Sequence, residues 1–102
     1  MKTYCFDIDG TLCQTTGSDY ENSIPKFERI KIVNELFESG HKIILFTARG
    51  STTGIDWHEV TLDQVTKWGI KFHELKLGKP SADIYIDDKG INDSDFFQEK
   101  IK

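Results

Sequence analysis

The sequence predicts an α/β domain built on a mainly parallel sheet of about four strands. Apolar runs with strand character alternate along the chain with helical patterns of apolar residues, and this order is typical of a parallel sheet. Polar, glycine-containing loops separate the runs. The 102 residues are enough for one hydrophobic core with little to spare, so we expect residues 1–102 to form a single domain.

The first strand is expected at residues 3–8, which are apolar on both faces like a strand at the centre of a sheet. Residues 10–23 are rich in Gly, Thr, Ser and Asn and are expected to form a loop. A helix is expected over 24–40, with Pro25 in its first turn and Gly40 at its end. Its predicted buried stripe consists of Phe27, Ile30, Val33 and Phe37.

A second buried strand is expected at 41–47 and a polar loop at 48–56. The pattern at 57–69 predicts a second helix, with Asp56 as the N-cap and Glu59 completing a capping box. The apolar face of this helix is predicted to contain Trp57, Val60, Val65 and Trp68.

The remaining elements are a weaker strand at 70–77, a fourth strand at 82–88 and a closing helix at 93–101. Ligands bind to sheets of this kind outside the carboxyl ends of the strands. The functional residues are therefore expected in the loops that follow the strands.

Composition narrows the function classes. The formal net charge of −4 argues against a domain that binds a nucleic-acid backbone. No stretch approaches the roughly 20 apolar residues of a membrane span. The N-terminal residues lack the pattern of a signal peptide, which favours the cytoplasm. Cys5 and Cys13 belong to no CxxC pair, and we interpret Cys5 as a core residue and Cys13 as a loop residue beside the aspartates.

Acidic residues stand at two of the predicted strand ends. Asp7 and Asp9 end the first strand, and Asp87 and Asp88 end the fourth. Parallel strands bring these carboxylates to one edge of the sheet, where four negative charges repel unless a cation lies among them. Carboxylate oxygens without a His or Cys cluster indicate Mg²⁺. The alternative for Asp7 and Asp9 is a strand-ending turn in which the aspartates cap backbone amides, and the alternative for Asp87 and Asp88 is a solvated turn.

The spacing of Asp7 and Asp9 also suggests catalysis. Residues i and i+2 of a strand point to the same side, so one carboxylate can attack phosphorus while the other exchanges a proton. Gly10 allows a sharp turn beside a ligand. The Thr47 hydroxyl and the Lys79 ammonium can bind the oxygens of a phosphoryl group.

Four stretches, "DIDGT", "ILFTARG", "GKP" and "YIDD", resemble in order the four motifs of the haloacid dehalogenase superfamily of phosphohydrolases. The resemblance covers nearly the whole chain, and its first motif is the most specific. It implies a three-layer Rossmann-like domain and a Mg²⁺-dependent, two-step phosphatase reaction. The second aspartate, Asp9, is absent from the dehalogenases of the superfamily, so its presence favours phosphate chemistry.

The resemblance also implies a role for each motif residue. Asp7 is the expected nucleophile, and Asp9 protonates the leaving alcohol and then activates water. The metal ligands are Asp7, the backbone carbonyl of Asp9, and Asp87, with Asp88 as a further ligand or an acceptor beside them. The expected phosphate-binding residues are Thr47, Ala48, Arg49 and Lys79.

Three features of the motif region depart from the pattern or leave an alternative open. Lys79 lies only eight residues before Asp87, which leaves no room for the usual intervening helix, so Lys76 or Lys89 is an alternative phosphate ligand. Arg49 either binds the substrate or pairs with a surface acid. No segment is long enough for a cap domain, and capless members either form oligomers or leave the site open to large substrates.

The function predicted from the sequence is a capless, Mg²⁺-dependent phosphomonoesterase acting on a small phosphorylated metabolite such as a sugar or polyol phosphate. The motifs look most like those of small bacterial phosphatase-like proteins, some linked to capsular polysaccharide genes. One alternative is a polynucleotide 3′-phosphatase, which the acidic composition disfavours. A second is a non-catalytic phosphate- or metal-binding module, and transfer to an acceptor other than water also stays open.

Overall fold

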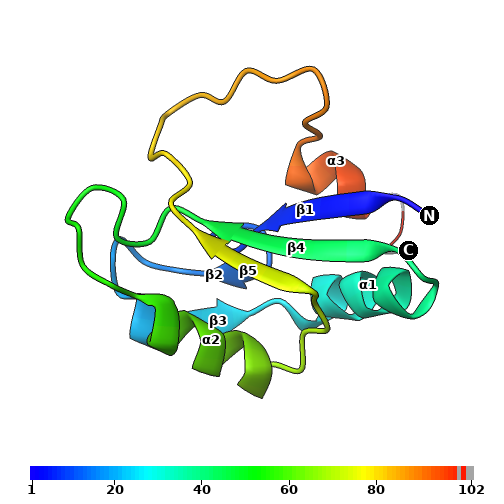
Figure 1. Cartoon of the computed structure of the whole chain (residues 1–102), viewed down its shortest axis with the longest axis horizontal. Helices are drawn as coiled ribbons and strands as arrows, with labels where there is room; N and C mark the ends of the chain where they lie inside the picture. Colours follow the sequence, from blue (N-terminus) through cyan, green and yellow to red (C-terminus); the bar gives the residue numbers. More distant parts are fainter. Residues whose placement is uncertain (99, 101–102) are drawn as a thin grey trace.

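The computed structural model of the chain describes residues 1–98 and residue 100. Its main sheet has three parallel strands, β1 (Thr3–Asp7), β4 (Lys42–Thr47) and β5 (Glu74–Leu77), in the order β1-β4-β5 (Figure 1). Asp7 pairs with Phe46, and the next residue, Thr47, pairs with Leu77. The carboxyl ends of all three strands therefore lie at one edge of the sheet, as the sequence predicts.

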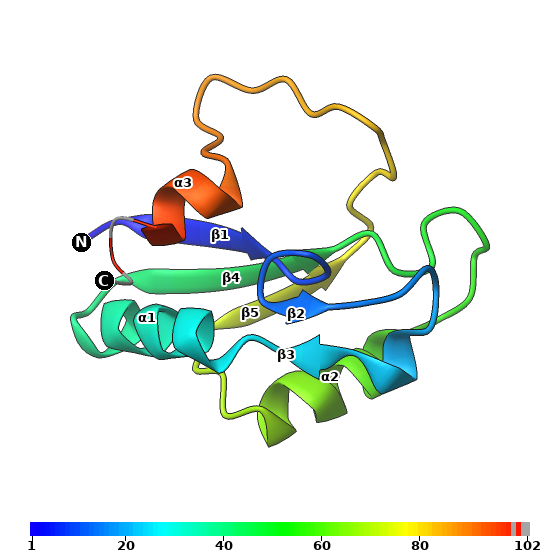
Figure 2. The same cartoon turned by 180° about the vertical axis from the view of Figure 1, so that it is seen from behind.

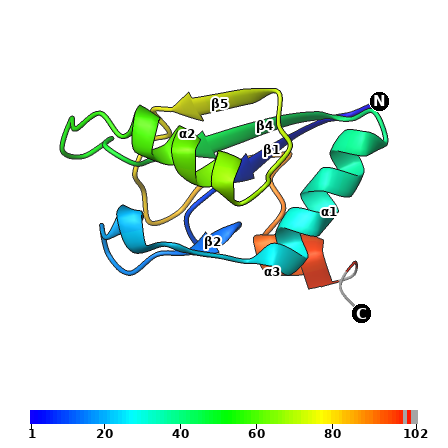
Figure 3. The same ribbon diagram turned by 90° about the horizontal axis from the view of Figure 1, so that it is seen from below.

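Three helices, α1 (Phe27–Glu38), α2 (His58–Lys67) and α3 (Asp93–Gln98), lie on the same side of the sheet (Figure 3). The opposite face carries Cys5, Ile44 and Phe46, which are exposed or half-buried. The described chain therefore has two layers, and the expected third layer is wrong for these residues. The predicted core position of Cys5 is wrong for the same reason, because no helix covers the face on which it lies.

The core lies between the sheet and the helices. Buried side chains from β1, the turn after it, β2, β4, α1, α2, the segment after α2 and α3 form one cluster: Phe6, Ile8, Leu12, Cys13, Ile30, Ile32, Val33, Ile43, Leu45, Val65, Ile70 and Phe97. Phe27, predicted to be buried, is 63% exposed because it occupies the first turn of α1, at the edge of the packed region.

A short antiparallel ribbon changes the predicted start of the first helix. Ile24–Pro25 forms β3 and pairs with β2 (Cys13–Gln14), and a single 3₁₀ turn, η1 (Tyr20–Asn22), precedes it. Pro25 is therefore a strand residue rather than part of the first helical turn. Pairing of β3 with β2 delays the start of the helix to Phe27.

The second helix begins near its predicted start but without the predicted capping box. Trp57 occupies the N-cap position, and its side chain makes no capping hydrogen bond. Asp56 instead accepts a hydrogen bond from the His58 amide at 3.0 Å, a local turn of the kind aspartate favours. Gly69 has φ +74° just beyond the helix, consistent with its predicted role as a stop.

The predicted strand at 82–88 is not formed, so the sheet has three strands rather than about four. Every residue from 80 to 92 is exposed, and the segment arches away from β1 (Figures 1 and 2). The Tyr85 hydroxyl donates to the Pro80 carbonyl and accepts from the Ala82 amide. These local hydrogen bonds tie Tyr85 to Pro80 and Ala82, and no residue from 82 to 88 pairs with a strand of the described sheets.

The last predicted helix is observed as α3, which ends at Gln98, while residues 99, 101 and 102 lie outside the described part of the chain. No helix within the described residues is long and apolar enough to cross a membrane.

Candidate functional site

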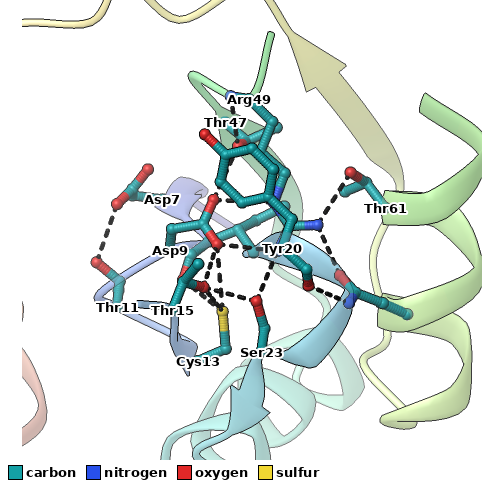
Figure 4. Close-up of polar contacts among 12 residues, drawn as sticks. Asp7, Asp9, Thr11, Cys13, Thr15, Tyr20, Ser23, Thr47, Arg49 and Thr61 are labelled. Atoms are coloured by element: carbon teal, nitrogen blue, oxygen red, sulfur yellow. Dashed lines mark hydrogen bonds and ion pairs between the residues drawn. The ribbon is translucent and has the colours of Figure 1, made fainter. Parts of the chain in front are cut away.

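The candidate site is built on a tight turn that follows β1 (Figure 4). The Leu12 amide donates to the Ile8 carbonyl at 2.8 Å, and the Gly10 amide donates to the Cys13 carbonyl at 2.8 Å. Gly10 has φ +85°, a conformation that side-chain-bearing residues rarely adopt. The turn therefore fixes the backbone around Ile8, which is buried and whose two sequence neighbours are Asp7 and Asp9.

Asp7 is partly open to solvent, with 32% of its side chain exposed. Its Oδ1 lies 3.3 Å from the Lys79 Nζ, and its Oδ2 accepts a hydrogen bond from Thr11 at 3.4 Å. Burial raises the pKa of Asp7 above its usual value, and the Lys79 charge opposes that shift. A carboxylate in such a position is reachable by a ligand and is more basic than one in water.

Asp9 is held much more tightly. Its Oδ1 accepts hydrogen bonds from Thr15 at 2.6 Å and from Arg49 Nη2 at 2.9 Å. Its Oδ2 accepts from Arg49 Nε at 2.9 Å and from Thr47 at 3.3 Å. Burial acts to raise the pKa of Asp9, but the hydrogen bonds from Arg49 and Thr15 outweigh it, and the pKa is lowered. Asp9 is therefore ionised at neutral pH.

Arg49 is the partner that dominates this arrangement. Its side chain has no exposed surface, and its guanidinium lies 4.8 Å from the centre of the Tyr20 ring. Besides Asp9, it donates through Nη1 to Thr61 at 3.2 Å and to Gln64 at 2.6 Å. The sequence leaves two alternatives for Arg49, which are binding to substrate and pairing with a surface acid. In this structure it pairs with an acid of the site itself.

Thr47 and Ala48 occupy the end of β4 and the start of the following loop. The Thr47 hydroxyl is fully buried, donates to Asp9 and accepts from the Arg49 amide at 3.1 Å. Ala48 is half-buried, and its carbonyl accepts from Ser51 in a turn. The predicted roles of both residues in phosphate binding stay predictions.

Lys79 lies beside Asp7 because it follows β5, whose carboxyl end lies at the same edge of the sheet as that of β1. Its amide donates to the Thr47 carbonyl at 3.1 Å, and its Nζ lies 4.3 Å from the centre of the Tyr85 ring. The alternative lysines are differently placed. Lys76 is exposed and lies 3.5 Å from Glu74, and Lys89 is exposed on the arched segment. Geometry therefore favours Lys79 as the cation beside Asp7.

Asp87 and Asp88 do not join the other two aspartates. Both are exposed, and Asp87 accepts a hydrogen bond from the Lys89 amide at 2.9 Å. Within the described residues, no three His, Cys, Asp or Glu side chains are grouped so as to hold a metal ion. The predicted convergence of four carboxylates is wrong for this structure, because the segment carrying Asp87 and Asp88 does not pair with β1. Their role as metal ligands stays a prediction.

Several polar residues around Asp9 and Arg49 were not predicted from the sequence. Thr15 and Ser23 share a hydrogen bond of 2.6 Å across the loop that joins β2 to β3. Gln64 donates to the Tyr20 carbonyl at 2.5 Å. One signal was present: Thr61 follows Trp57 by four residues and so lies on the predicted apolar face of the helix. The loop residues carried no comparable signal.

Comparison with known proteins gives structural matches. No protein-family model matches the sequence, and neither does any curated protein. A chain from a structure of a Pnkp1/Rnl/Hen1 complex has a TM-score of 0.61 at 23% identity, and one from a Pnkp1/Rnl/Hen1 RNA repair complex has 0.60 at 20%. This chain covers 35% and 32% of those two chains. These matches show that the fold is shared.

A third match is more extensive. A crystal structure of a Vibrio cholerae protein superimposes with a TM-score of 0.84 and is 30% identical in sequence. The match covers 99% of this chain and 94% of the other, so nearly the whole of both molecules is compared. The chain therefore belongs to the same family as this Vibrio cholerae protein.

Proposed function

We propose that the protein is a phosphomonoesterase of the haloacid dehalogenase type that works through an aspartyl-phosphate on Asp7. One observation carries the proposal: Asp7 is a partly exposed, basic carboxylate with the Lys79 ammonium 3.3 Å away. A cation beside a nucleophile can hold a phosphoryl group against it and stabilise the charge that develops during transfer. The motif resemblance, which covers nearly the whole chain, assigns the same role to Asp7.

The proposed reaction has two steps. An oxygen of Asp7 attacks phosphorus, the bond from phosphorus to the ester oxygen breaks, and the leaving oxygen takes the proton that Asp9 carries in its protonated form. Water then loses a proton to Asp9 and attacks phosphorus, which releases inorganic phosphate and regenerates Asp7. The ionised state of Asp9 suits the second step. The same ionised state opposes proton donation in the first, so we expect esters with less basic leaving groups to react faster.

The motif resemblance adds Mg²⁺ to this scheme, held by Asp7, the Asp9 carbonyl, Asp87 and Asp88. The described side chains do not form such a site. The proposed steps therefore use only the described side chains, and the comparison of Mg²⁺ with EDTA in the assay below measures whether the reaction requires the ion.

The proposed substrate is a small phosphorylated metabolite such as a sugar or polyol phosphate, because the net charge of −4 disfavours long polyanions. A polynucleotide 3′-phosphatase is the second candidate. It is favoured by the shared fold with two chains from structures of a Pnkp1/Rnl/Hen1 complex, one described as an RNA repair complex.

The test is release of inorganic phosphate from sugar phosphates, polyol phosphates and a 3′-phosphorylated oligonucleotide, each with Mg²⁺ and with EDTA. We expect turnover of at least one class by the wild-type protein and none by Asp7→Asn. The preferred class decides between the two candidates. Phosphate binding without turnover of any class would instead favour a non-catalytic module and would overturn the proposal.

A further inference from the structure

We propose that Arg49 is a positioning residue, which fixes the carboxylate of Asp9 and does not bind the substrate phosphate. This inference deepens the proposed function and rests on it for its consequences in catalysis. Its structural part, the dependence of Asp9 on Arg49, can be measured whether or not the protein is an enzyme.

The hydrogen-bond donors of Arg49 are all used within the protein. A guanidinium has five N–H donors. Nε and one Nη2 donor bind the two oxygens of Asp9, both at 2.9 Å. Nη1 donates to Thr61 and Gln64, and the second Nη2 donor lies 3.4 Å from the Ser23 hydroxyl. All five donors are therefore engaged within the protein, and a substrate phosphate would have to displace one of these partners.

Arg49 is also less accessible to a ligand than Asp9 or Lys79. The Arg49 side chain has no exposed surface, whereas Asp9 and Lys79 keep 24% and 20% of theirs. A phosphate approaching Asp7 from solvent therefore meets Lys79 without any rearrangement, and reaches Arg49 only if the surrounding residues move. The bidentate geometry of the Arg49–Asp9 pair is also the arrangement that fixes a carboxylate most firmly.

The hydrogen-bond partners of Arg49 come from different elements of the fold. Asp9 belongs to the turn after β1, Ser23 precedes β3, and Thr61 and Gln64 belong to α2. Arg49 thus connects the turn that carries the acid–base residue to the helix and to the β2–β3 ribbon (Figure 4). Loss of any of these contacts is expected to let the Asp9 carboxylate rotate, and small displacements of a catalytic group are costly in rate.

The test compares Arg49→Lys, Gln64→Leu and the wild-type protein, with Lys42→Met as the control. Arg49→Lys keeps the positive charge but loses the two-pronged geometry. Gln64→Leu removes one hydrogen-bond partner of Arg49 while Asp9 and Arg49 themselves keep their identity, so it serves if Arg49→Lys does not fold. Lys42→Met removes the cation of an ion pair with Glu74 on the strands, and it leaves the Asp9 network intact.

Two readouts are needed. The first is the orientation of the Asp9 carboxylate in crystal structures of the variants, which we expect to rotate away from its wild-type position in Arg49→Lys and, by less, in Gln64→Leu. The second is steady-state kinetics on the substrate found by the phosphate-release assay. We expect kcat to fall by about 100-fold in Arg49→Lys with little change in KM.

An Asp9 carboxylate that keeps its wild-type position in both variants would overturn the inference. So would a large rise in KM at constant kcat, since that result indicates loss of a direct substrate contact. If the wild-type protein releases no phosphate, the proposed function fails, and the variant structures alone still decide whether Arg49 positions Asp9.

Discussion

Both carboxylate oxygens of Asp9 face the Arg49 guanidinium, with Oδ1 2.9 Å from Nη2 and Oδ2 2.9 Å from Nε. Asp7, two residues earlier, contacts a single ammonium at 3.3 Å and is partly open to solvent. Burial therefore dominates at Asp7 and raises its pKa, while hydrogen bonding dominates at Asp9 and lowers its pKa. Two carboxyl groups whose pKa values are driven apart in this way are suited to different chemical roles.

The Arg49–Asp9 pair is expected to stabilise the fold at neutral pH. Asp9→Asn leaves the buried guanidinium without its counter-charge, at a cost of about 3 kcal/mol in free energy of unfolding. Because the pKa of Asp9 in the folded protein lies below its usual 3.8, this contribution is complete above pH 3.8 and is lost as the pH falls through the folded-state pKa. Urea unfolding of both proteins across this range measures it. A stability difference that is constant down to strongly acidic pH would contradict the account.

Asp7→Asn is expected to abolish phosphate release without destabilising the protein. The raised pKa of Asp7 means that its charge opposes folding at neutral pH, so the uncharged side chain should give an equal or higher melting temperature. The advantage should shrink as the pH falls and Asp7 takes up a proton. Thermal melts at neutral and acidic pH check this sign. A clearly lower melting temperature at neutral pH would show that the Lys79 contact matters more than burial.

Lys79→Met tests which lysine serves the site. Loss of the ammonium 3.3 Å from Asp7 should raise KM and should raise the pKa of Asp7 further, because the Lys79 charge now lowers it. Lys76→Met and Lys89→Met are matched controls, since both lysines are exposed and neither is placed beside Asp7 in this structure. Kinetics of the three variants decide the question. A larger effect at either control position would move the phosphate-binding role to that lysine.

Trypsin tests the position of the arched segment. Lys89 lies among thirteen consecutive exposed residues, from 80 to 92, and we expect cleavage after it before cleavage at lysines in α1 or α2. Mass spectrometry of short digests identifies the first cut. Repeating the digest with Mg²⁺ tests the predicted ligands Asp87 and Asp88, because binding there should protect the segment. Resistance of Lys89 without any added ion would contradict the exposed placement.

Much of the fold is predictable from the sequence because its patterns are local and strong. Buried apolar runs predict β1 and β4 nearly to the residue, and Gly69 correctly marks the end of α2. The segment at 82–88 shows the limit. Its alternation is the pattern of a strand, but a strand also needs a partner, and Tyr85 instead closes a local turn onto Pro80.

The site is predictable to a similar extent. The i and i+2 spacing of Asp7 and Asp9 predicts that both carboxylates address one ligand, and this stays a prediction. In the structure Asp7 is the last residue of β1, and Asp9 lies in the turn that follows it. The sequence left open whether Arg49 binds a substrate or pairs with an acid, because the answer depends on α2 and on the β2–β3 ribbon. Thr61 and Gln64 belong to α2, and their contacts with Arg49 depend on how α2 packs beside the site.

The most direct test of the central claim is identification of the phosphorylated residue. The protein is mixed with a substrate that it hydrolyses, quenched rapidly in acid and mapped by peptide mass spectrometry. The account predicts a phosphoryl group on Asp7 at early times, and none in Asp7→Asn. Turnover without any phosphorylated protein, or with the phosphoryl group on another residue, would contradict it.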